Sequence, residues 1–373
     1  MHFVHSLNEG GIERLLLELC NKTNKQKFEI QICCLVEKGI LAAQFESAGI
    51  QIHFVNAQRD FSVNNIAPNF FVLIKIIKLL RKKNINITHG HEFFSTVFSR
   101  IAGVAAGIKK NFITLHNSYT WWGKGVHKTQ KLLSYITTGI ICNSKATLEY
   151  SLLHDRIKSE KYILIYNGID CNRFMPKESS RKNFCEALKI NESRFICMTV
   201  GSISPRKGLE YLIKAASILN EEFPDMVYVI VGGKHANEGS EFNRITDLFS
   251  DLNLESNIFI TGSRNDISEI LNYCDLYVMP SVVEGFGLAL AEAMAEEKIC
   301  IASDIAPFRE ILEDGENGFL FKTEDSIALA EKIKKVRVMS DDDLDKIKKR
   351  ARVTIVDKFN SDTMIKNYEE LYL

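Results

Sequence analysis

Two carboxylates, Glu284 and Glu292, stand in the segment YVMPSVVEGFGLALAEAMAEE (277–297), which is otherwise almost entirely small or apolar. Glu is a good helix former and interacts favourably with a helix N-terminus, so each Glu alone has an ordinary explanation. The neighbours of Glu292 look like a buried helix face, however, and a Glu buried there needs a hydrogen-bonding partner. The Gly-Phe-Gly turn at 285–287 lets backbone approach a ligand and leaves N–H groups at a helix start. The segment therefore predicts an anion site with carboxylates beside it.

Two cations, Arg206 and Lys207, stand at the start of a predicted helix that begins near Leu209. Two cations at a helix N-terminus oppose the helix dipole, which is unexpected for purely structural charges. A bound anion would explain them. For Arg206 alone, an ordinary solvated surface position remains an equal alternative, because Lys and Arg are common on protein surfaces.

The segment SLNEGGIERLLLELC (6–20) places Gly10 and Gly11 between a short strand and an amphipathic helix. Backbone N–H groups at such a turn can meet a phosphate or a sugar hydroxyl. A Gly-Gly pair is by itself usually just a turn, and the three-glycine spacing of a dinucleotide fingerprint is missing. The pair is therefore a candidate binding loop, not a dinucleotide motif.

Three histidines, His89, His91 and His116, lie at predicted strand ends. Metal ligation would need a further acidic ligand and a closed geometry that the sequence does not specify, so we predict no metal site. Polar histidines that line a crevice are the favoured interpretation. His116 follows the clearest strand, and its ring can hydrogen-bond a substrate hydroxyl or a backbone carbonyl.

These residues need a scaffold, and the sequence predicts parallel sheets with crossover helices. Short apolar or β-branched runs alternate with longer helical patterns along the chain. Most of these runs lead into Gly, Ser, Asn or His, and ligands of open α/β sheets bind at the carboxyl ends of the strands. We therefore expect the site residues to cluster after strands. Examples of the predicted strands lie within 28–36, 111–116, 139–143, 161–168, 195–201, 226–233, 257–262, 275–281 and 298–304.

The length of 373 residues and the 46% hydrophobic content predict two domains. Apolar periodicity fades within 167–195, so we divide the chain into 1–171 and 172–359, with a last helix at 360–373 that packs back on the first domain. No apolar run is long enough to cross a membrane, and the start lacks the pattern of a secretory signal. Nine scattered Cys favour reduced thiols in a cytoplasm.

The net charge is zero, but basic and acidic residues are distributed unevenly along the chain. Residues 1–170 carry 21 Lys and Arg against 12 Asp and Glu, and the remainder carries 26 against 35. A basic half suggests an anionic partner such as membrane lipid or a phosphorylated acceptor. Nucleic acid is the weakest candidate, because the basic residues are not interleaved with aromatic ones.

Two segments of the chain support the hypothesis of an acceptor at a membrane surface. Lys75, Lys78 and Lys82 share one face of a predicted helix, for which a sheet-covering helix with a solvated edge is the favoured interpretation. Trp121 and Trp122 stand beside further Lys residues. A lipid-linked acceptor therefore remains a hypothesis.

Together these segments resemble glycosyltransferase family 4, the retaining, nucleotide-sugar-dependent transferases of GT-B fold. The fold that this resemblance implies is α/β, with two Rossmann-like domains whose parallel sheets face each other across an interdomain cleft. The similarity covers nearly the whole chain. It is carried by SLNEGGIER (6–14), YNGIDCNRF (166–174), VGSISPRKGLEYLIKA (200–215) and DLYVMPSVVEGFGLALAEAMA (275–295).

The resemblance also implies roles for the site residues. Lys207 is expected to contact the diphosphate, Glu292 the ribose hydroxyls, and His116 the transfer site. Glu284 is expected to hold the donor sugar, with the donor phosphates on the backbone of Gly285, Phe286, Gly287 and Leu288 and with Gly10 and Gly11 approaching from the other domain. We expect His116, Glu284 and Lys207 to be the catalytic group.

The sequence departs from the family pattern at two places. The family commonly has an Arg directly after the glycine that ends the first strand of the second domain, where this chain has Ser202. Ser202 itself is expected in the donor site, and Arg206 is the obvious substitute for the missing Arg. The usual Gly and Pro after the second Glu are replaced by Glu297 and Ile299, which affects the loop before a strand more than the site.

The expected function is retaining transfer of a hexosyl or N-acetylhexosaminyl group from a UDP or GDP sugar to a lipid-linked or surface-polysaccharide glycan. No metal, other cofactor or enzymic nucleophile is expected, and the protein is expected in the cytoplasm, with peripheral contact to the membrane. A sugar-nucleotide epimerase or a phosphorylase on the same fold is an alternative, which product analysis on donor alone would detect. A non-catalytic sugar-nucleotide-binding module is a second alternative, which would show no turnover.

Overall fold

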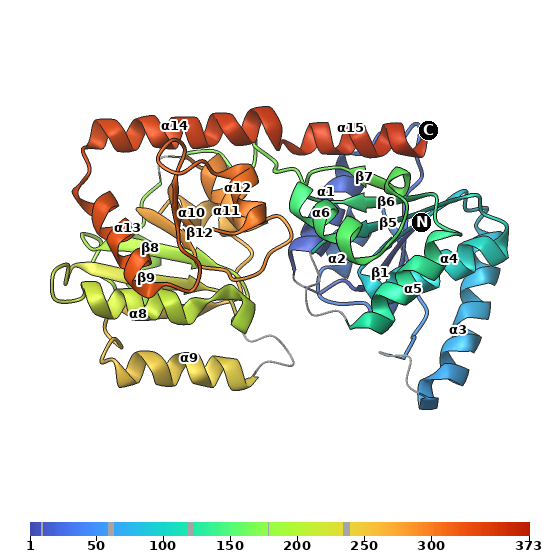
Figure 1. Ribbon diagram of the computed structural model, residues 1–373, viewed down its shortest axis with the longest axis horizontal. Helices are drawn as coiled ribbons and strands as arrows, with labels where there is room; N and C mark the ends of the chain where they lie inside the picture. Colours follow the sequence, from blue (N-terminus) through green and yellow to red (C-terminus); the bar gives the residue numbers. More distant parts are fainter. Residues whose placement is uncertain (9, 59–62, 118–122, 178, 234–238) are drawn as a thin grey trace. The chain divides into compact units, whose positions relative to one another are not determined.

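The computed structural model describes the chain except residues 9, 59–62, 118–122, 178 and 234–238, and the side chains of 63, 64 and 66 (Figure 1). The chain forms two compact units. Unit 1 comprises Met1–Gly168 and Ser361–Leu373, and unit 2 comprises Ile169–Asn360. The division lies close to the predicted boundary at 171, and the last helix belongs to unit 1. Among the described helices, none is both long and apolar enough to cross a membrane.

Unit 1 contains a seven-stranded parallel sheet in the order β3-β2-β1-β4-β5-β6-β7. Its strands are β1 (His2–Ser6), β2 (Gln31–Glu37), β3 (Gln51–Phe54), β4 (Ile87–His91), β5 (Lys110–Leu115), β6 (Gly139–Cys142) and β7 (Tyr162–Leu164). Its helices are α1 (Gly11–Lys22), α2 (Ala42–Ser47), α3 (Val63–Lys82), α4 (Phe93–Ala106), α5 (Lys124–Ser134), α6 (Lys145–His154), the short 3₁₀ turn η1 (Ser159–Lys161) and α15 (Ser361–Tyr372).

Unit 2 contains a six-stranded parallel sheet in the order β10-β9-β8-β11-β12-β13. Its strands are β8 (Phe195–Val200), β9 (Met226–Val231), β10 (Ile258–Gly262), β11 (Leu276–Met279), β12 (Ile299–Ser303) and β13 (Phe319–Phe321). Its helices are α7 (Lys182–Leu188), η2 (Pro205–Lys207), α8 (Leu209–Leu219), α9 (Gly239–Asp251), α10 (Ile267–Leu271), α11 (Leu288–Ala295), α12 (Ala306–Ile311), α13 (Ser326–Val338) and α14 (Asp341–Lys358).

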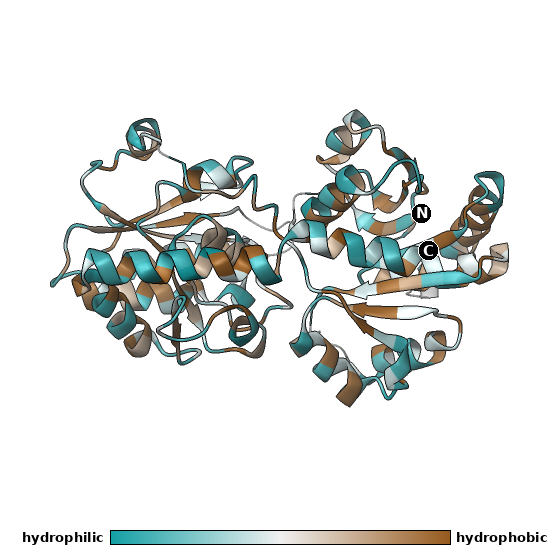
Figure 2. Cartoon of the chain, turned by 90° about the horizontal axis from the view of Figure 1, so that it is seen from above, coloured by the Kyte–Doolittle hydropathy of each residue, from teal (hydrophilic) through white to brown (hydrophobic). Residues whose placement is uncertain are grey.

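Each unit therefore has the α/β architecture that the alternating pattern predicts, and every predicted strand segment overlaps an observed strand. Strands of a sheet covered on both faces carry apolar side chains throughout, and all six residues of β9, MVYVIV, are buried. In Figure 2 the strands are largely brown, and long helices carry both teal and brown residues. Helices that pack on a sheet need such an amphipathic composition, with an apolar face toward the sheet.

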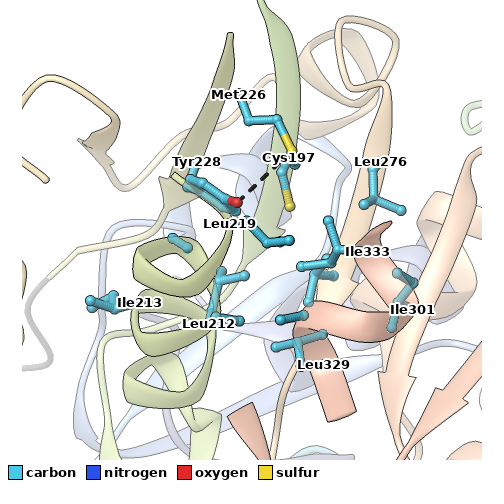
Figure 3. Packing of buried hydrophobic residues seen from close by; sticks show 14 of the residues in the cluster. Cys197, Leu212, Ile213, Leu219, Met226, Tyr228, Leu276, Ile301, Leu329 and Ile333 are labelled. Carbon is cyan, nitrogen blue, oxygen red and sulfur yellow. Dashed lines mark hydrogen bonds between the residues drawn. The ribbon is translucent and has the colours of Figure 1, made fainter. Parts of the chain in front are cut away.

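The core of unit 2 shows how helices cover its sheet. Leu212 and Leu219 of α8 and Leu329 and Ile333 of α13 pack with Leu276 and other strand side chains in one buried cluster (Figure 3). All five side chains are at most 3% exposed. Burial of this kind is the main stabilising contribution to such a unit and gives the strand ends a rigid support.

The strand order reverses once in each sheet, between β1 and β4 in unit 1 and between β8 and β11 in unit 2. At such a switch point, the two neighbouring crossover connections run to opposite faces of the sheet. Ligands of open α/β sheets bind in the crevice that results, outside the carboxyl ends of the strands. The loops after these four strands are therefore where each unit is expected to bind a ligand.

Candidate functional site

The switch point of unit 2 brings together the loops that follow β8 and β11. The backbone N–H of Val282 donates to the carbonyl of Arg206 at 2.8 Å. Gly208 has φ 60°, and a Cβ at this position would lie 2.1 Å from the carbonyl oxygen of Pro280. Only glycine fits so close a backbone approach in a left-handed conformation. The two loops are thus held against each other.

An ion pair between Lys207 and Glu284 lies at this junction. Lys207 Nζ donates to Glu284 Oε1 at 2.5 Å, and Ser281 Oγ donates to the same oxygen at 3.0 Å. The two charged side chains are only 14% and 10% exposed. The structure therefore places two of the three residues predicted to be catalytic in direct contact, although they are 77 residues apart in the sequence.

The electrostatics of this pair favour the ionised carboxylate. Burial by itself raises the pKa of Glu284, but the positive charges of Lys207 and Arg206 and the hydrogen bonds to the carboxylate outweigh it and lower the pKa below its ordinary value. Arg206 is exposed and Ser202 is half-buried. The site therefore holds a fixed carboxylate with one half-buried and one exposed cation nearby.

The Gly-Phe-Gly turn leads directly into α11. Gly287 precedes the helix with φ 104°, and a Cβ there would lie 2.6 Å from Phe308 Cε1. Phe286 is 2% exposed, and its ring contacts Phe359 edge-on at 5.5 Å. The Phe286 side chain is therefore a core anchor, so only its backbone is available to a donor. Gly285 is buried next to it.

The helix α11 carries Glu292 on a largely apolar surface, as predicted. Its buried residues are Leu290, Ala291, Ala293, Met294 and Ala295. Glu292 is half-buried, as is Leu288 at the start of the helix. The pKa of the Tyr277 hydroxyl is raised well above its ordinary value, mainly by burial and further by the charges of Cys300 and Glu292. Glu292 therefore lies near this buried ring.

The switch point of unit 1 begins with the Gly10-Gly11 turn. Gly10 precedes α1 in an extended conformation, and a Cβ there would lie 2.4 Å from Glu13 Oε2. The Glu13 carboxyl therefore lies against the turn, and a side chain at position 10 would displace it. Gly11 is exposed at the first position of the helix.

Two carboxyl groups at this switch point, Glu13 and Glu92, were not predicted as site residues. Burial and the charge of Glu92 raise the pKa of Glu13 to about 8, and burial raises the pKa of Glu92 to about 7. Glu92 also has φ 63° and ψ 157°, a conformation that residues other than glycine rarely adopt. Their positions at a Gly-Gly turn and directly after the strand-end residue His91 were the available sequence signals.

Histidines from three adjacent strands meet beside these carboxyl groups. His2 Nδ1 lies 2.9 Å from His91 Nε2, and His91 Nδ1 lies 2.9 Å from His116 Nε2. The two nitrogens of His89 instead lie 2.5 Å from the Tyr372 hydroxyl and 2.7 Å from Thr114 Oγ1. His2 was missed, because a histidine within a short first strand carried no motif.

The helix α3, which carries Lys75, Lys78 and Lys82, covers the sheet of unit 1. Ile76 and Leu80 are at most 1% exposed in the core, whereas Lys75, Lys78 and Lys82 are exposed. The favoured interpretation of this segment as a covering helix with a solvated edge is confirmed. Trp121 and Trp122 lie outside the described residues.

Comparisons with known proteins cover nearly all of the chain. Residues 180–354 match the family model described as glycosyl transferases group 1, and 9–173 match the one described as glycosyltransferase family 4. A UDP-Gal:alpha-D-GlcNAc-diphosphoundecaprenol alpha-1,3-galactosyltransferase of Escherichia coli is 28% identical, over 98% of this chain and 94% of that protein.

Two further comparisons agree with this result. An N-acetylgalactosamine-N,N'-diacetylbacillosaminyl-diphospho-undecaprenol 4-alpha-N-acetylgalactosaminyltransferase of Campylobacter jejuni is 26% identical, over 96% of this chain and 94% of that protein. The crystal structure of Anabaena HepE with UDP and glucose has a TM-score of 0.88 and 21% identity, and the match covers 99% of this chain and 97% of that chain. The structural similarity supports the predicted fold.

Proposed function

Since this chain belongs to the GT-B glycosyltransferases of family 4, which use nucleotide sugars, we propose that it transfers a hexosyl or N-acetylhexosaminyl group to a lipid-linked or surface-polysaccharide glycan with retention of configuration. The observation that carries the proposal is the largely buried pair of Lys207 and Glu284 at the switch point of unit 2. A cation and a carboxylate held side by side there suit a donor that has a diphosphate and a sugar.

The names of the similar proteins support a UDP sugar and a lipid-linked acceptor. The Escherichia coli relative uses UDP-Gal, and both it and the Campylobacter jejuni relative act on glycans linked to undecaprenol through a diphosphate. We propose the same acceptor class for this chain. The excess of Lys and Arg in residues 1–170 is consistent with an anionic diphospholipid and with a peripheral position on the cytoplasmic face of the membrane.

The chemistry requires stabilisation of the departing diphosphate. In our proposal Lys207 and the N-terminus of α11 supply preorganised positive charge, Glu284 orients the donor sugar, and Glu292 binds the ribose hydroxyls. Front-face transfer with retention uses no enzymic nucleophile. We propose that the reaction needs no metal ion, because the positive charges of the chain take that role.

Transfer assays test this proposal directly. The protein is incubated with UDP and GDP sugars and a diphosphoundecaprenol-linked N-acetylglucosamine acceptor, with and without EDTA, and the new linkage is determined by NMR. We expect an α-linked product from an α-configured donor, with full activity in EDTA. A β-linked product would contradict retention, and a requirement for metal would contradict the proposed role of the protein cations.

The same assay separates the two alternatives. An epimerase would change the donor sugar without an acceptor, and a phosphorylase would require phosphate. A binding module would raise its melting temperature with a nucleotide sugar and yet transfer nothing. Sedimentation with anionic vesicles at low salt then tests the membrane contact, which should weaken as salt is added.

A further inference from the structure

The residues His2, His91 and His116 form a continuous row of imidazole hydrogen bonds across β1, β4 and the end of β5. We propose that His2 and His91 are positioning residues that hold His116 in a single tautomer, so that its Nδ1 meets a substrate hydroxyl in one defined hydrogen-bonding role. This inference rests on the proposed function only for the identity of the substrate.

The geometry leaves one nitrogen at the end of the row for another molecule. His91 uses both of its ring nitrogens inside the row, each at 2.9 Å from a neighbouring histidine. His116 uses Nε2 for the row, and its buried Nδ1 has no hydrogen-bond partner within the described part of the chain. A buried polar atom without a partner is costly, so a ligand that supplies one is favoured.

The three rings are neutral, which makes their tautomers depend on one another. Burial lowers the pKa of His2 and of His91 well below the ordinary value and lowers that of His116 to about 3. A neutral imidazole has one N–H donor and one acceptor nitrogen. Within the row, His91 must therefore donate to one neighbour and accept from the other.

Only two arrangements satisfy both hydrogen bonds. In the first, His2 donates to His91, His91 donates to His116, and His116 carries its proton on Nδ1. In the second, every bond is reversed, and His116 Nδ1 is an acceptor. A mixed arrangement would place two N–H groups or two lone pairs opposite each other at 2.9 Å. A change of tautomer at His116 therefore requires a change at all three rings.

A metal site is the competing explanation for this cluster. Nitrogens of His2, His89 and His91 lie within 4.8 Å of one another. However, His2 Nδ1 and His91 Nε2 lie 2.9 Å apart, which is the spacing of a hydrogen bond between one donor nitrogen and one acceptor nitrogen. Both nitrogens of His89 and of His91 already have hydrogen-bond partners. The geometry favours the hydrogen-bonded row.

Long-range ¹H–¹⁵N correlation spectra of the full chain labelled with ¹⁵N-histidine test the inference, because they report the tautomer of each ring. We expect His2, His91 and His116 each to show one tautomer. The three tautomers should match one of the two arrangements, so that both hydrogen bonds run in the same direction along the row. We expect His91→Phe to leave His116 as a mixture of tautomers. His89→Phe is the matched control, because His89 stacks in the same cluster without joining the row.

Two results would overturn the inference. One is a mixture of tautomers at His116 in the unmodified protein, which needs no variant. The other is a single, unchanged His116 tautomer in His91→Phe. If that variant does not fold, His91→Asn replaces it, since the Asn amide can still face His116 but cannot reach His2. We expect His91→Asn to weaken the tautomer preference of His116, and an unchanged preference would contradict the row.

Activity measurements keep this inference distinct from the proposed function. We expect His91→Phe to lower kcat by roughly tenfold to a hundredfold, with little change in the donor KM, because the substrate hydroxyl is less well oriented. If the tautomers behave as expected but no transfer occurs, the proposed function fails and the row stands. If transfer occurs and the His116 tautomer is unchanged in His91→Phe, the inference alone fails.

Discussion

At the residue scale, the pair of Lys207 and Glu284 has a structural role and a proposed chemical role. The sequence placed both residues after strands and predicted both for the donor site. It could not show that they contact each other, because that contact depends on the close approach of two loops through Gly208 and Pro280. A test of either residue must therefore separate folding from catalysis.

We predict that Lys207→Ala lowers turnover by roughly a hundredfold, through lost stabilisation of the leaving group. It should also destabilise unit 2 by roughly 3 kcal/mol, because Glu284 is left buried without its cation. The control is Lys207→Ala combined with Glu284→Gln, which removes the unpaired charge. Denaturant unfolding should show recovered stability in the double variant, while transfer stays low. Recovery of transfer would contradict the proposed role of Lys207.

We predict that Arg206→Ala lowers turnover by about tenfold, because its charge acts on the same site from an exposed position. Arg206 stands near the position where the family commonly has an Arg and this chain has Ser202. Adding Ser202→Arg should partly restore transfer in the Arg206→Ala background. Full activity of Arg206→Ala by itself would show that Arg206 is an ordinary surface residue.

The carboxyl groups of Glu13 and Glu92 predict a pH dependence of stability. Their pKa values are raised to about 8 and about 7 in the folded protein, so the folded state holds protons that the unfolded state releases. This contribution is complete below pH 4.5 and is lost as the pH rises through 7 and 8. We predict that Glu13→Gln raises the melting temperature at pH 9 and flattens its decline between pH 5 and 9.

The matched control for Glu13→Gln is Glu149→Gln, whose carboxylate is 64% exposed beside Lys145. It should leave the slope of melting temperature against pH unchanged. Equal slopes in Glu13→Gln and the unmodified protein would show that the Glu13 carboxyl is ionised in the folded state. The raised values follow from burial in the tertiary structure, which explains why the sequence pattern did not single out either residue.

At the scale of secondary-structure elements, periodicity located most of the scaffold but missed two of the four edge strands. The apolar runs predicted β8, β9, β11 and β12, because central parallel strands are apolar on both faces. The sequence pattern did not single out β3 and β13, which lie at sheet edges and have four and three residues. Such short segments have too little alternation or apolar length to stand out from loops.

In the loop between α11 and β12, the sequence departs from the family pattern at Glu297. Glu297 has φ 55°, so it adopts a left-handed conformation where the family usually has Gly. This conformation costs roughly 1–2 kcal/mol for a residue with a side chain. Arg352 Nε lies 3.9 Å from Glu297 Oε1, a partly exposed ion pair that offsets little of this cost.

We predict that Glu297→Gly stabilises the protein by roughly 1 kcal/mol, with transfer activity unchanged, because the site residues lie elsewhere. The control is Glu297→Ala, which removes the same ion pair and keeps a Cβ in the left-handed region. Chemical denaturation should rank Glu297→Gly above the unmodified protein and Glu297→Ala at or below it. The reverse order would show that the ion pair with Arg352 outweighs the backbone strain.

At the scale of the whole molecule, the segment Ser361–Leu373, which holds the last helix, belongs to the same unit as Met1–Gly168, although all of unit 2 lies between them in the chain. Tyr372 of α15 hydrogen-bonds His89, and its ring lies near Phe28 and Phe112 at centroid distances of 6.1 and 5.9 Å. Helical spacing predicted this helix, since its apolar residues recur on one face. The rings that it meets in unit 1 come from segments that no local pattern relates to it.

We predict that Tyr372→Ala destabilises unit 1 by roughly 3–5 kcal/mol, as expected for removal of a large buried aromatic side chain. Native-state hydrogen exchange should show faster exchange of the amides of β4 and β5, with the amides of β8 and β9 in unit 2 as internal references. The matched control is Tyr372→Phe, which keeps the ring and loses only the hydroxyl, so it should cost about 1 kcal/mol through the hydrogen bond to His89. Faster exchange in α14, with β4 and β5 unchanged, would mean that α15 stabilises the preceding helix and not the sheet of unit 1. The expected pattern would show that residues at opposite ends of the sequence form one cooperative unit, because the side chains that α15 buries belong to the sheet of unit 1.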